Sequence, residues 1–206
     1  MAVTLSKALV LFLSISFLTS TAYKYFVQKK KKEKQKETNE VIMFSYEECE
    51  LKKSKYSRCT ITKSMDRFLH YLASPKYSLD VCIYVFTNSD IANVLLKLHY
   101  KGIKIRIIID ADMAYCTGSN LRRMERQGIP VRWMKSTNLM HHKFCIIDAV
   151  NIDDVHPLVI AGSLNWTNQA LCGNWENVLV TSQADLVNQF KTEFEKLWLQ
   201  FTPITS

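Results

Sequence analysis

Short apolar segments that alternate with amphipathic ones constrain the fold of this chain most strongly. The apolar runs have the length and the bounding turn residues of strands buried in a sheet, and we expect strands at 79–86, 103–109, 131–134, 143–148, 158–161 and 176–181. The intervening segments place apolar residues at helical spacing, and we expect helices at 64–72, 89–101, 118–127 and 185–201. Such alternation predicts an α/β fold, a layered sheet flanked by helices.

The N-terminal part of the chain differs in composition. Residues 8–23 carry no charge and are mostly apolar, and Lys7 and Lys24 can extend this short segment by snorkelling. The lysines clustered at 29–36 favour an uncleaved anchor with its C-terminal flank in the cytosol. A signal peptide cleaved after Ala22 is the alternative. We expect a membrane anchor helix at 1–27, a charged linker at 28–45 and a catalytic domain at 46–206.

The expected strand 143–148 carries a reactive group at its entrance. His141 and Lys143 are two residues apart, so their side chains point to the same face. Ser163 and Asn165 follow the next expected strand and supply neutral donors. A histidine nucleophile or acid, a fixed ammonium and neutral donors suit a phosphodiester.

Two neighbours of this pair are expected to have other roles. Asp148 ends the same strand, too far away to reach the spot where His141 and Lys143 converge, so we expect it to brace the fold. His142 faces the opposite side from His141, and a packing role is favoured.

Together these residues resemble the HKD signature of the phospholipase D superfamily. His141–Asp148 reads H-x-K-x4-D, Gly162–Thr167 reads G-S-L-N-W-T and Asn174–Asn177 reads N-W-E-N, which is similar to the short Zucchini-like family. The likeness extends from about Phe68 to Phe201, and it implies a phospholipase D-like fold.

The resemblance also implies a mechanism that needs neither cofactor nor metal. His141 would be the nucleophile in one subunit and the acid and base in the other. Lys143, Ser163 and Asn165 would hold the phosphoryl oxygens, and Glu176 would hydrogen-bond the far nitrogen of His141. Since the reaction needs two histidines and the chain has one H-x-K, we expect a homodimer with a shared site on its two-fold axis.

Three functions fit this resemblance. The first is a single-strand-specific endoribonuclease that matures piRNA at the mitochondrial outer membrane, with the domain facing the cytosol. The second is a mitochondrial phospholipase that hydrolyses cardiolipin or another anionic phospholipid, which the expected anchor supports. The third is a non-catalytic membrane adaptor, and the intact motif argues against it.

A basic block precedes the motif. Residues 101–143 contain nine basic and three acidic residues, a net charge of +6. We expect Arg122, Arg123 and Arg126 to form a basic rim that binds a polyanionic substrate such as single-stranded RNA. An ordinary solvated face is the alternative.

Cysteine spacing and one long turn complete the sequence predictions. The Zucchini-like family often has a zinc-binding insertion near Cys49 and Cys59, but here no second cysteine pair or nearby histidine completes four ligands, so we expect no metal. Cys82 and Cys145 lie in apolar strands and are expected in the core. Residues 149–161 form a longer turn than the family needs, predicted to be a surface loop of unknown purpose.

Overall fold

The computed structural model describes residues 2–33, 37–45, 50–152 and 155–203, and the chain divides into two compact units, Met1–Glu37 and Thr38–Ser206. In the first unit, α1 covers Ala2–Glu33. Among the described residues, no helix combines the length and the hydropathy needed to cross a membrane. The anchor at residues 8–23 is therefore not confirmed.

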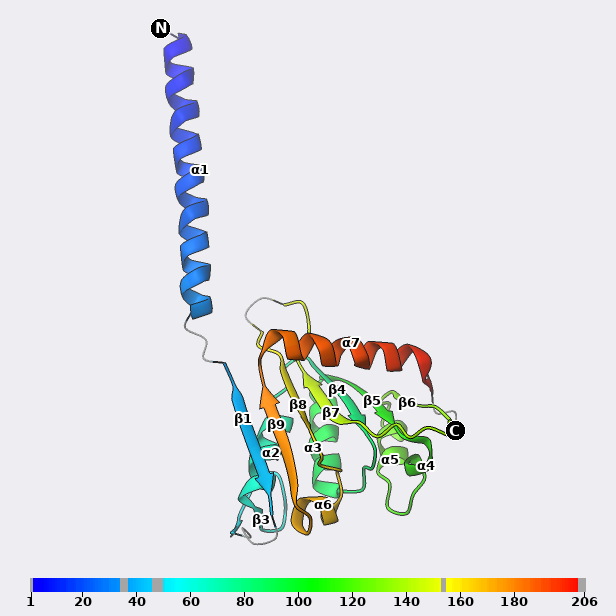
Figure 1. Ribbon diagram of the computed structural model, residues 1–206. Helices are drawn as coiled ribbons and strands as arrows, with labels where there is room; N and C mark the ends of the chain where they lie inside the picture. The colour runs from blue at the N-terminus through cyan, green and yellow to red at the C-terminus, as the bar shows by residue number, and fades with distance from the viewer. Residues whose placement is uncertain (1, 34–36, 46–49, 153–154, 204–206) are drawn as a thin grey trace. The chain divides into compact units, whose positions relative to one another are not determined.

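The second unit contains an eight-stranded sheet in the order β1-β9-β8-β7-β4-β5-β6-β10 (Figure 1). The strands are β1 (Asn39–Phe44), β4 (Ser78–Ile83), β5 (Lys104–Ile109), β6 (Val131–Trp133), β7 (Lys143–Ile147), β8 (Leu158–Gly162), β9 (Glu176–Thr181) and β10 (Thr202–Pro203). Strands β4, β5 and β6 are parallel neighbours, and the other pairs are antiparallel. The expected α/β layered sheet is confirmed.

Strand β1 lies in the segment expected to be a linker. Its alternation buries Ile42 and Phe44 while Val41 and Met43 stay exposed. It pairs antiparallel with β9 over its whole length, from Asn39 opposite Thr181 to Phe44 opposite Glu176. Because the preceding residues are highly charged, the sequence pattern indicated a linker where this edge strand lies. The compact domain begins at Thr38 rather than at residue 46.

Helices cover both faces of the sheet. They are α2 (Lys63–Leu72), α3 (Ser89–Tyr100), α4 (Ala111–Ala114), α5 (Leu121–Arg126), α6 (Asn168–Cys172) and α7 (Ala184–Gln200), and a small sheet pairs β2 (Leu51–Lys52) with β3 (Ile61–Thr62). Thr62 caps α2, and Asn88 caps α3 because its side chain accepts a bond from the N–H of Ile91.

Two hydrophobic clusters lie on opposite faces of the sheet. Alternation along the strands places Cys145 in the cluster packed against α2, α3 and α5, whereas Cys82 lies in the cluster under α7. Both cysteines are buried, and burial raises the pKa of both thiols. Their expected role as small core residues is confirmed.

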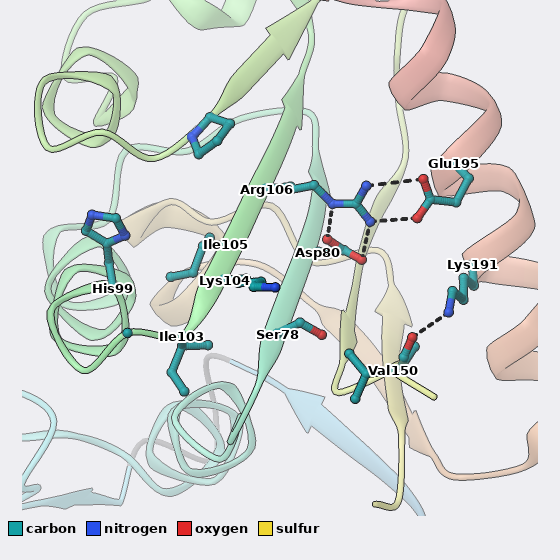
Figure 2. Close-up of a pocket in the computed structure, with 13 residues that line it drawn as sticks. Ser78, Asp80, His99, Ile103, Lys104, Ile105, Arg106, Val150, Lys191 and Glu195 are labelled. Carbon is teal, nitrogen blue, oxygen red and sulfur yellow. Dashed lines mark hydrogen bonds and ion pairs between the residues drawn. The ribbon is translucent and has the colours of Figure 1, made fainter. Parts of the chain in front are cut away.

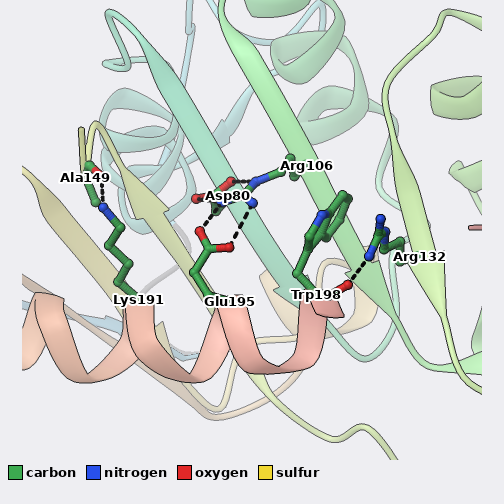
Figure 3. A network of polar contacts seen from close by, with 7 residues as sticks. All are labelled: Asp80, Arg106, Arg132, Ala149, Lys191, Glu195 and Trp198. Carbon is green, nitrogen blue, oxygen red and sulfur yellow. Dashed lines mark hydrogen bonds and ion pairs between the residues drawn. The ribbon is translucent and has the colours of Figure 1, made fainter. Parts of the chain in front are cut away.

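A polar network fixes α7 to the sheet (Figure 3). Arg106 of β5 donates to both carboxylate oxygens of Asp80, at 2.7 and 2.8 Å, and to Glu195 of α7, at 2.7 and 3.1 Å. Its guanidinium carbon lies 4.8 Å from the ring centroid of Phe194. Arg132 of β6 donates to the carbonyl of Trp198. Two arginines of the basic block, Arg106 and Arg132, therefore stabilise the packing of α7 against the sheet.

The strand register gathers the motif at one end of the sheet. Lys143, the first residue of β7, lies opposite Ile83, the last residue of β4, while Gly162 ends β8 opposite Val178 near the start of β9. The segments that follow β4 and β8, and those that precede β7 and β9, all emerge at this end (Figure 1).

Candidate active site

His141 and Lys143 lie side by side at this end of the sheet, as their spacing predicted. The Nζ atom of Lys143 lies 3.2 Å from Nδ1 and 3.3 Å from Nε2 of His141, and it donates to the carbonyl oxygen of His141 at 2.9 Å. His141 is exposed and Lys143 is partly buried. An anion placed here would contact both side chains at once.

Tyr84 forms the wall beside this pair. Its ring centroid is 4.5 Å from that of His141, and Nζ of Lys143 lies 5.1 Å from it. Tyr84 directly follows Ile83, the residue paired with Lys143. The sequence reasoning missed it, because only the pairing of β4 with β7 brings it to the motif.

Burial changes the ionisation of Lys143. Desolvation lowers the pKa of its ammonium, while the negative charge of Glu176 acts in the opposite direction. The side chain is therefore a cation whose proton is held less firmly than that of an exposed lysine.

Ser163 and Glu176 form a second group at the same sheet end. The hydroxyl of Ser163 donates to Glu176 Oε2 at 2.5 Å and accepts the backbone N–H of Asn177 at 3.1 Å. Asn174 Nδ2 donates to Glu176 Oε1 at 2.9 Å. The sequence motif contains Asn174, but its spacing alone does not predict that this side chain lies beside the carboxylate of Glu176.

Within one chain the carboxylate of Glu176 accepts bonds from Ser163 and Asn174, and the expected hydrogen bond to His141 stays a prediction. Glu176 begins β9 and His141 precedes β7, and strand β8 lies between these two. Ser163 directly follows β8 and bonds one oxygen of Glu176, while Asn174 bonds the other.

Gly162 allows the close approach that builds this group. A Cβ atom on Gly162 would lie 2.1 Å from the carbonyl oxygen of Asn177, a distance that backbone atoms cannot tolerate. The N–H of Ser163 donates to that same carbonyl at 3.0 Å. The glycine therefore sets the position of Ser163 against β9.

Asn165 presents an unsatisfied polar group. Its Oδ1 atom is buried and has no hydrogen-bond partner among the residues that the structure describes. Buried polar atoms nearly always have a partner, and the exceptions concentrate where a further group binds. The unpaired Oδ1 can accept a bond from a donor of a bound group, and the expected donation of Asn165 to phosphoryl oxygens stays a prediction.

Asp148 lies at the other end of β7 and braces the fold, as expected. Its carboxylate accepts the backbone N–H groups of Lys76 at 2.8 Å, Tyr77 at 2.7 Å and Ser78 at 2.9 Å. It is buried and has a positive φ of 52°. These bonds clamp the end of β7 to the segment that enters β4.

His142 contacts the side of α7 rather than the His141 pair. Its ring centroid lies 5.6 Å from that of Phe144, and its Nε2 atom is 4.0 Å from Glu193 of α7. The side chain is 52% exposed, so its packing is confined to the surface.

The three arginines of the expected basic rim have different surroundings. Arg122 places its guanidinium 5.4 Å from the ring centroid of Tyr115, whereas Arg123 donates to Asn93 Oδ1 of α3 at 2.7 Å. Arg126 ends α5 and is exposed. All three are exposed, and the basic rim stays a prediction.

A cavity of about 560 Å³ lies at the opposite end of the sheet from His141 (Figure 2). Ser78 and Lys104, the first residues of β4 and β5, line it, together with Arg106 and Val150. The guanidinium of Arg106 is saturated by carboxylates, and Lys191 donates to the carbonyl of Ala149. The start of the enlarged turn thus lines this cavity, away from the motif.

The prediction that Cys49 and Cys59 bind no zinc concerns a segment that the structure describes only in part. Cys59 is exposed, and Cys49 lies outside the described residues. Where the structure does describe the chain, no three His, Cys, Asp or Glu side chains converge as a metal site. The expectation of no zinc stays a prediction.

Comparison with known proteins supports the assignment that the motif suggests. The family model described as cardiolipin synthase, PLD-like domain, matches residues 68–198. The chain belongs to the phospholipase D-like family. That family contains hydrolases of phosphodiesters, and the match includes every expected catalytic residue from His141 to Glu176.

Several relatives carry the same curated name. The mitochondrial cardiolipin hydrolase of Chlamydomonas reinhardtii is 45% identical over 138 residues, which cover 67% of this chain and 59% of that protein. The Homo sapiens protein of the same name is 36% identical over 140 residues, covering 68% and 53%. The chain thus spans a little over half the length of these relatives.

Solved structures agree with the fold. The phospholipase D family member Nuc from Salmonella typhimurium superposes with a TM-score of 0.67 at 24% identity, covering 83% of this chain and all of that one. NucT from Helicobacter pylori gives 0.66 at 22% identity, covering 82% and 100%. At this identity the likeness concerns the fold.

Proposed function

We propose that this chain is a phosphodiesterase that works through a phosphohistidine intermediate in a homodimer. The observation that carries the proposal is the placement of His141 against Lys143, at 3.2 Å, on the sheet end that also holds Ser163, Asn165 and Glu176. A nucleophile and a fixed cation at one exposed spot are what phosphoryl transfer requires.

The reaction divides into two displacements. In the first, a nitrogen of His141 bonds to phosphorus, and the bond from phosphorus to the leaving oxygen breaks while His141 of the second copy protonates that oxygen. In the second, that same histidine takes a proton from water, whose oxygen attacks phosphorus and displaces the first His141. Lys143 neutralises the phosphoryl oxygens, and Asn165 would donate to them through its Nδ2 amide group.

The dimer follows from the number of histidines that the chemistry uses. Each chain has one H-x-K motif, and His142 is directed toward Phe144 and Glu193 instead. A second copy therefore supplies the second catalytic histidine, with the site on the two-fold axis. Glu176 of each copy stays bonded to Ser163 and positions that hydroxyl.

Single-stranded RNA is the proposed substrate, cleaved as an endoribonuclease in piRNA maturation. Two features support RNA binding: exposed positive charges and an aromatic ring beside the catalytic histidine. Arg122, Arg123 and Arg126 are exposed cations, and Tyr84 places a ring beside His141 on which a base can stack. The names of the relatives favour one other candidate, hydrolysis of cardiolipin in a mitochondrial membrane.

Localisation is part of this proposal. We place the protein at the mitochondrial outer membrane with the catalytic domain in the cytosol, because the relatives are named mitochondrial and lysines follow residues 8–23. Attachment through residues 8–23 stays a prediction, which carbonate extraction of purified mitochondria and mass determination of the mature chain would test.

One experiment decides between the substrates. The purified full chain is offered a single-stranded RNA and cardiolipin vesicles, with His141→Asn as the inactive variant and His142→Asn as the matched control. We expect RNA cleavage that is lost only in His141→Asn, and excess His141→Asn should suppress the wild type through mixed dimers. Cardiolipin cleavage without RNA cleavage would favour the phospholipase, and full activity in a demonstrated monomer would refute the shared site.

A further inference from the structure

A basic groove lies against helices α3 and α5, outside the H-x-K site. Its volume is about 450 Å³. Lys55 and Arg58, between β2 and β3, form one side, Lys97 and Tyr100 of α3 form another, and Arg123 of α5 closes it. Three segments far apart in the sequence therefore place four cations around one hollow.

Within the residues that the structure describes, no ion pair neutralises these four cations. Asp90 is the one acidic residue that lines the groove, and within the described parts of the chain no carboxylate lies within 4.0 Å of the charged nitrogens of Lys55, Arg58 or Lys97. Arg123 uses one nitrogen for the amide oxygen of Asn93 and makes no such ion pair either. The positive potential of the groove is therefore available to a ligand.

A neighbouring cavity of about 640 Å³ provides the contrast, because it shares Lys55 with the groove. Three of its other cations are paired, with Lys52 at 2.5 Å from Asp66, Lys63 beside Glu50 and Arg67 at 2.6 Å from Glu40, whereas Lys53 has no ion pair among the described residues. Among the described residues, most cations of this cavity are therefore neutralised, whereas those of the groove are not.

Aromatic rings accompany the cations. The ring of Tyr100 is 67% exposed, yet its hydroxyl is held by a 2.5 Å hydrogen bond to Gln127 Oε1. Tyr56 is held in the same way by His70 Nδ1 at 3.3 Å, with Nζ of Lys55 5.1 Å from its ring centroid. Tyr56 packs in part against the hydrophobic core, whereas the exposed ring of Tyr100, fixed at its hydroxyl, is open for stacking at little entropic cost.

We infer that this groove binds a second segment of a single-stranded nucleic acid, away from the bond that is cleaved. Positive charge along a hollow, interleaved with fixed aromatic rings and amides, is the pattern of single-strand binding. A lipid headgroup would use the cations but leave the rings without a function. The inference deepens the proposed function, since it names where the substrate extends beyond His141.

The path of α3 connects the groove with the catalytic end of the sheet. The helix begins at Ser89, five residues after Tyr84, and ends at Tyr100 (Figure 1). Asp90 and Tyr100 both line the groove, and ten residues of helix span about 15 Å. A strand in the groove therefore runs away from the catalytic end, and only a strand longer than the cleavage site can occupy both.

The test measures binding, so that it does not depend on hydrolysis. Fluorescence anisotropy compares a short and a long single-stranded RNA on the full-length His141→Asn protein, with and without Lys55→Gln/Lys97→Gln. The matched control, Lys52→Gln/Lys63→Gln, removes the same charge from paired lysines. We expect the groove variant to weaken long-strand binding and to lower the salt slope by about 1.4, since each phosphate contact contributes about 0.7. The control should change neither.

Substitutions of Tyr100 provide a second, independent test of the inference. Tyr100→Leu should weaken long-strand binding about fivefold or more, whereas Tyr100→Phe, which keeps the ring, should lose much less. Equal losses in groove and control variants, or no loss with Tyr100→Leu, would overturn the inference. So would weaker binding of anionic phospholipid vesicles with RNA binding unchanged. Absence of hydrolysis with the expected binding pattern would refute the proposed function and leave the groove intact.

Discussion

Replacing Arg106 by Leu isolates the role of the polar network under α7. The Asp80 side chain is 9% exposed and receives two hydrogen bonds from Arg106, so the substitution leaves a buried carboxylate without its partner. Loss of one partner of a buried pair costs about 3–5 kcal/mol. Leu is much shorter than Arg, so its packing against Phe194 offsets little of this. For a domain of this size, about 4 kcal/mol lowers the melting temperature by roughly 8–16 °C.

A double variant separates charge burial from packing. In Asp80→Leu/Arg106→Leu no charge is left buried at the sheet, and apolar replacements of buried pairs are often neutral or stabilising. We therefore expect it to recover most of the stability lost in Arg106→Leu. Glu195→Gln should cost less than about 1 kcal/mol, because Glu195 is 43% exposed.

Thermal and urea unfolding followed by circular dichroism measure these differences. Arg123→Leu is the control, because Arg123 is exposed and bonds only to an amide. The reasoning would be refuted by a loss below about 1 kcal/mol in Arg106→Leu, which falls short of any buried unpaired charge. A double variant that is no more stable than the single one would refute it equally.

Three further predictions concern ionisation and close packing. Burial lowers the pKa of Lys143, so activity should fall at alkaline pH below the usual lysine range, and Lys143→Arg should shift this loss to higher pH in a pH–rate profile if it stays active. Arg67 lowers the pKa of Glu40 from 4.5 to about 2, so its stabilisation is present above pH 4.5 and is lost as pH falls toward 2; acid unfolding of Glu40→Gln should lack this component. Gly162→Ala, blocked by Asn177, should lower both melting temperature and turnover, whereas Gly102→Ala, with open space, should affect melting temperature alone.

Outcomes that would contradict these predictions are specific. If the activity of Lys143→Arg fell at the same alkaline pH as that of the wild type, ionisation of Lys143 would not be the cause of this loss. Parallel acid-unfolding curves for the wild type and Glu40→Gln would show that the contact with Arg67 contributes nothing. A fully active, stable Gly162→Ala would mean that β9 can move away from the carbonyl contact.

Much of the sheet was predictable from local pattern. The strands β4, β5, β7, β8 and β9 are apolar runs bounded by charges or glycine, and local spacing alone puts His141 and Lys143 on one face. The clamp at Asp148 was also predictable, because the far end of a strand cannot reach its entrance.

Strand order could not be predicted in the same way, and the errors follow from that. Tyr84 reaches His141 only because β4 pairs with β7, and Glu176 bonds Ser163 because β8 separates β9 from β7. Strand β1 was missed because its partner β9 is more than 130 residues away, so nothing local marks Ile42 and Phe44 as buried. Long-range pairing is not contained in local periodicity.

The clamp at Asp148 has a consequence for how damage to this protein would be detected. Its bonds to Lys76, Tyr77 and Ser78 fix β7 at one end, while Lys143 and His141 emerge at the other. A residue inserted within β7 would leave the clamp closed but turn the H-x-K pair toward the wrong face, since side chains alternate. Such a chain can show a cooperative unfolding transition and still have no activity. A measurement of thermal stability is therefore no substitute for an activity assay on such variants.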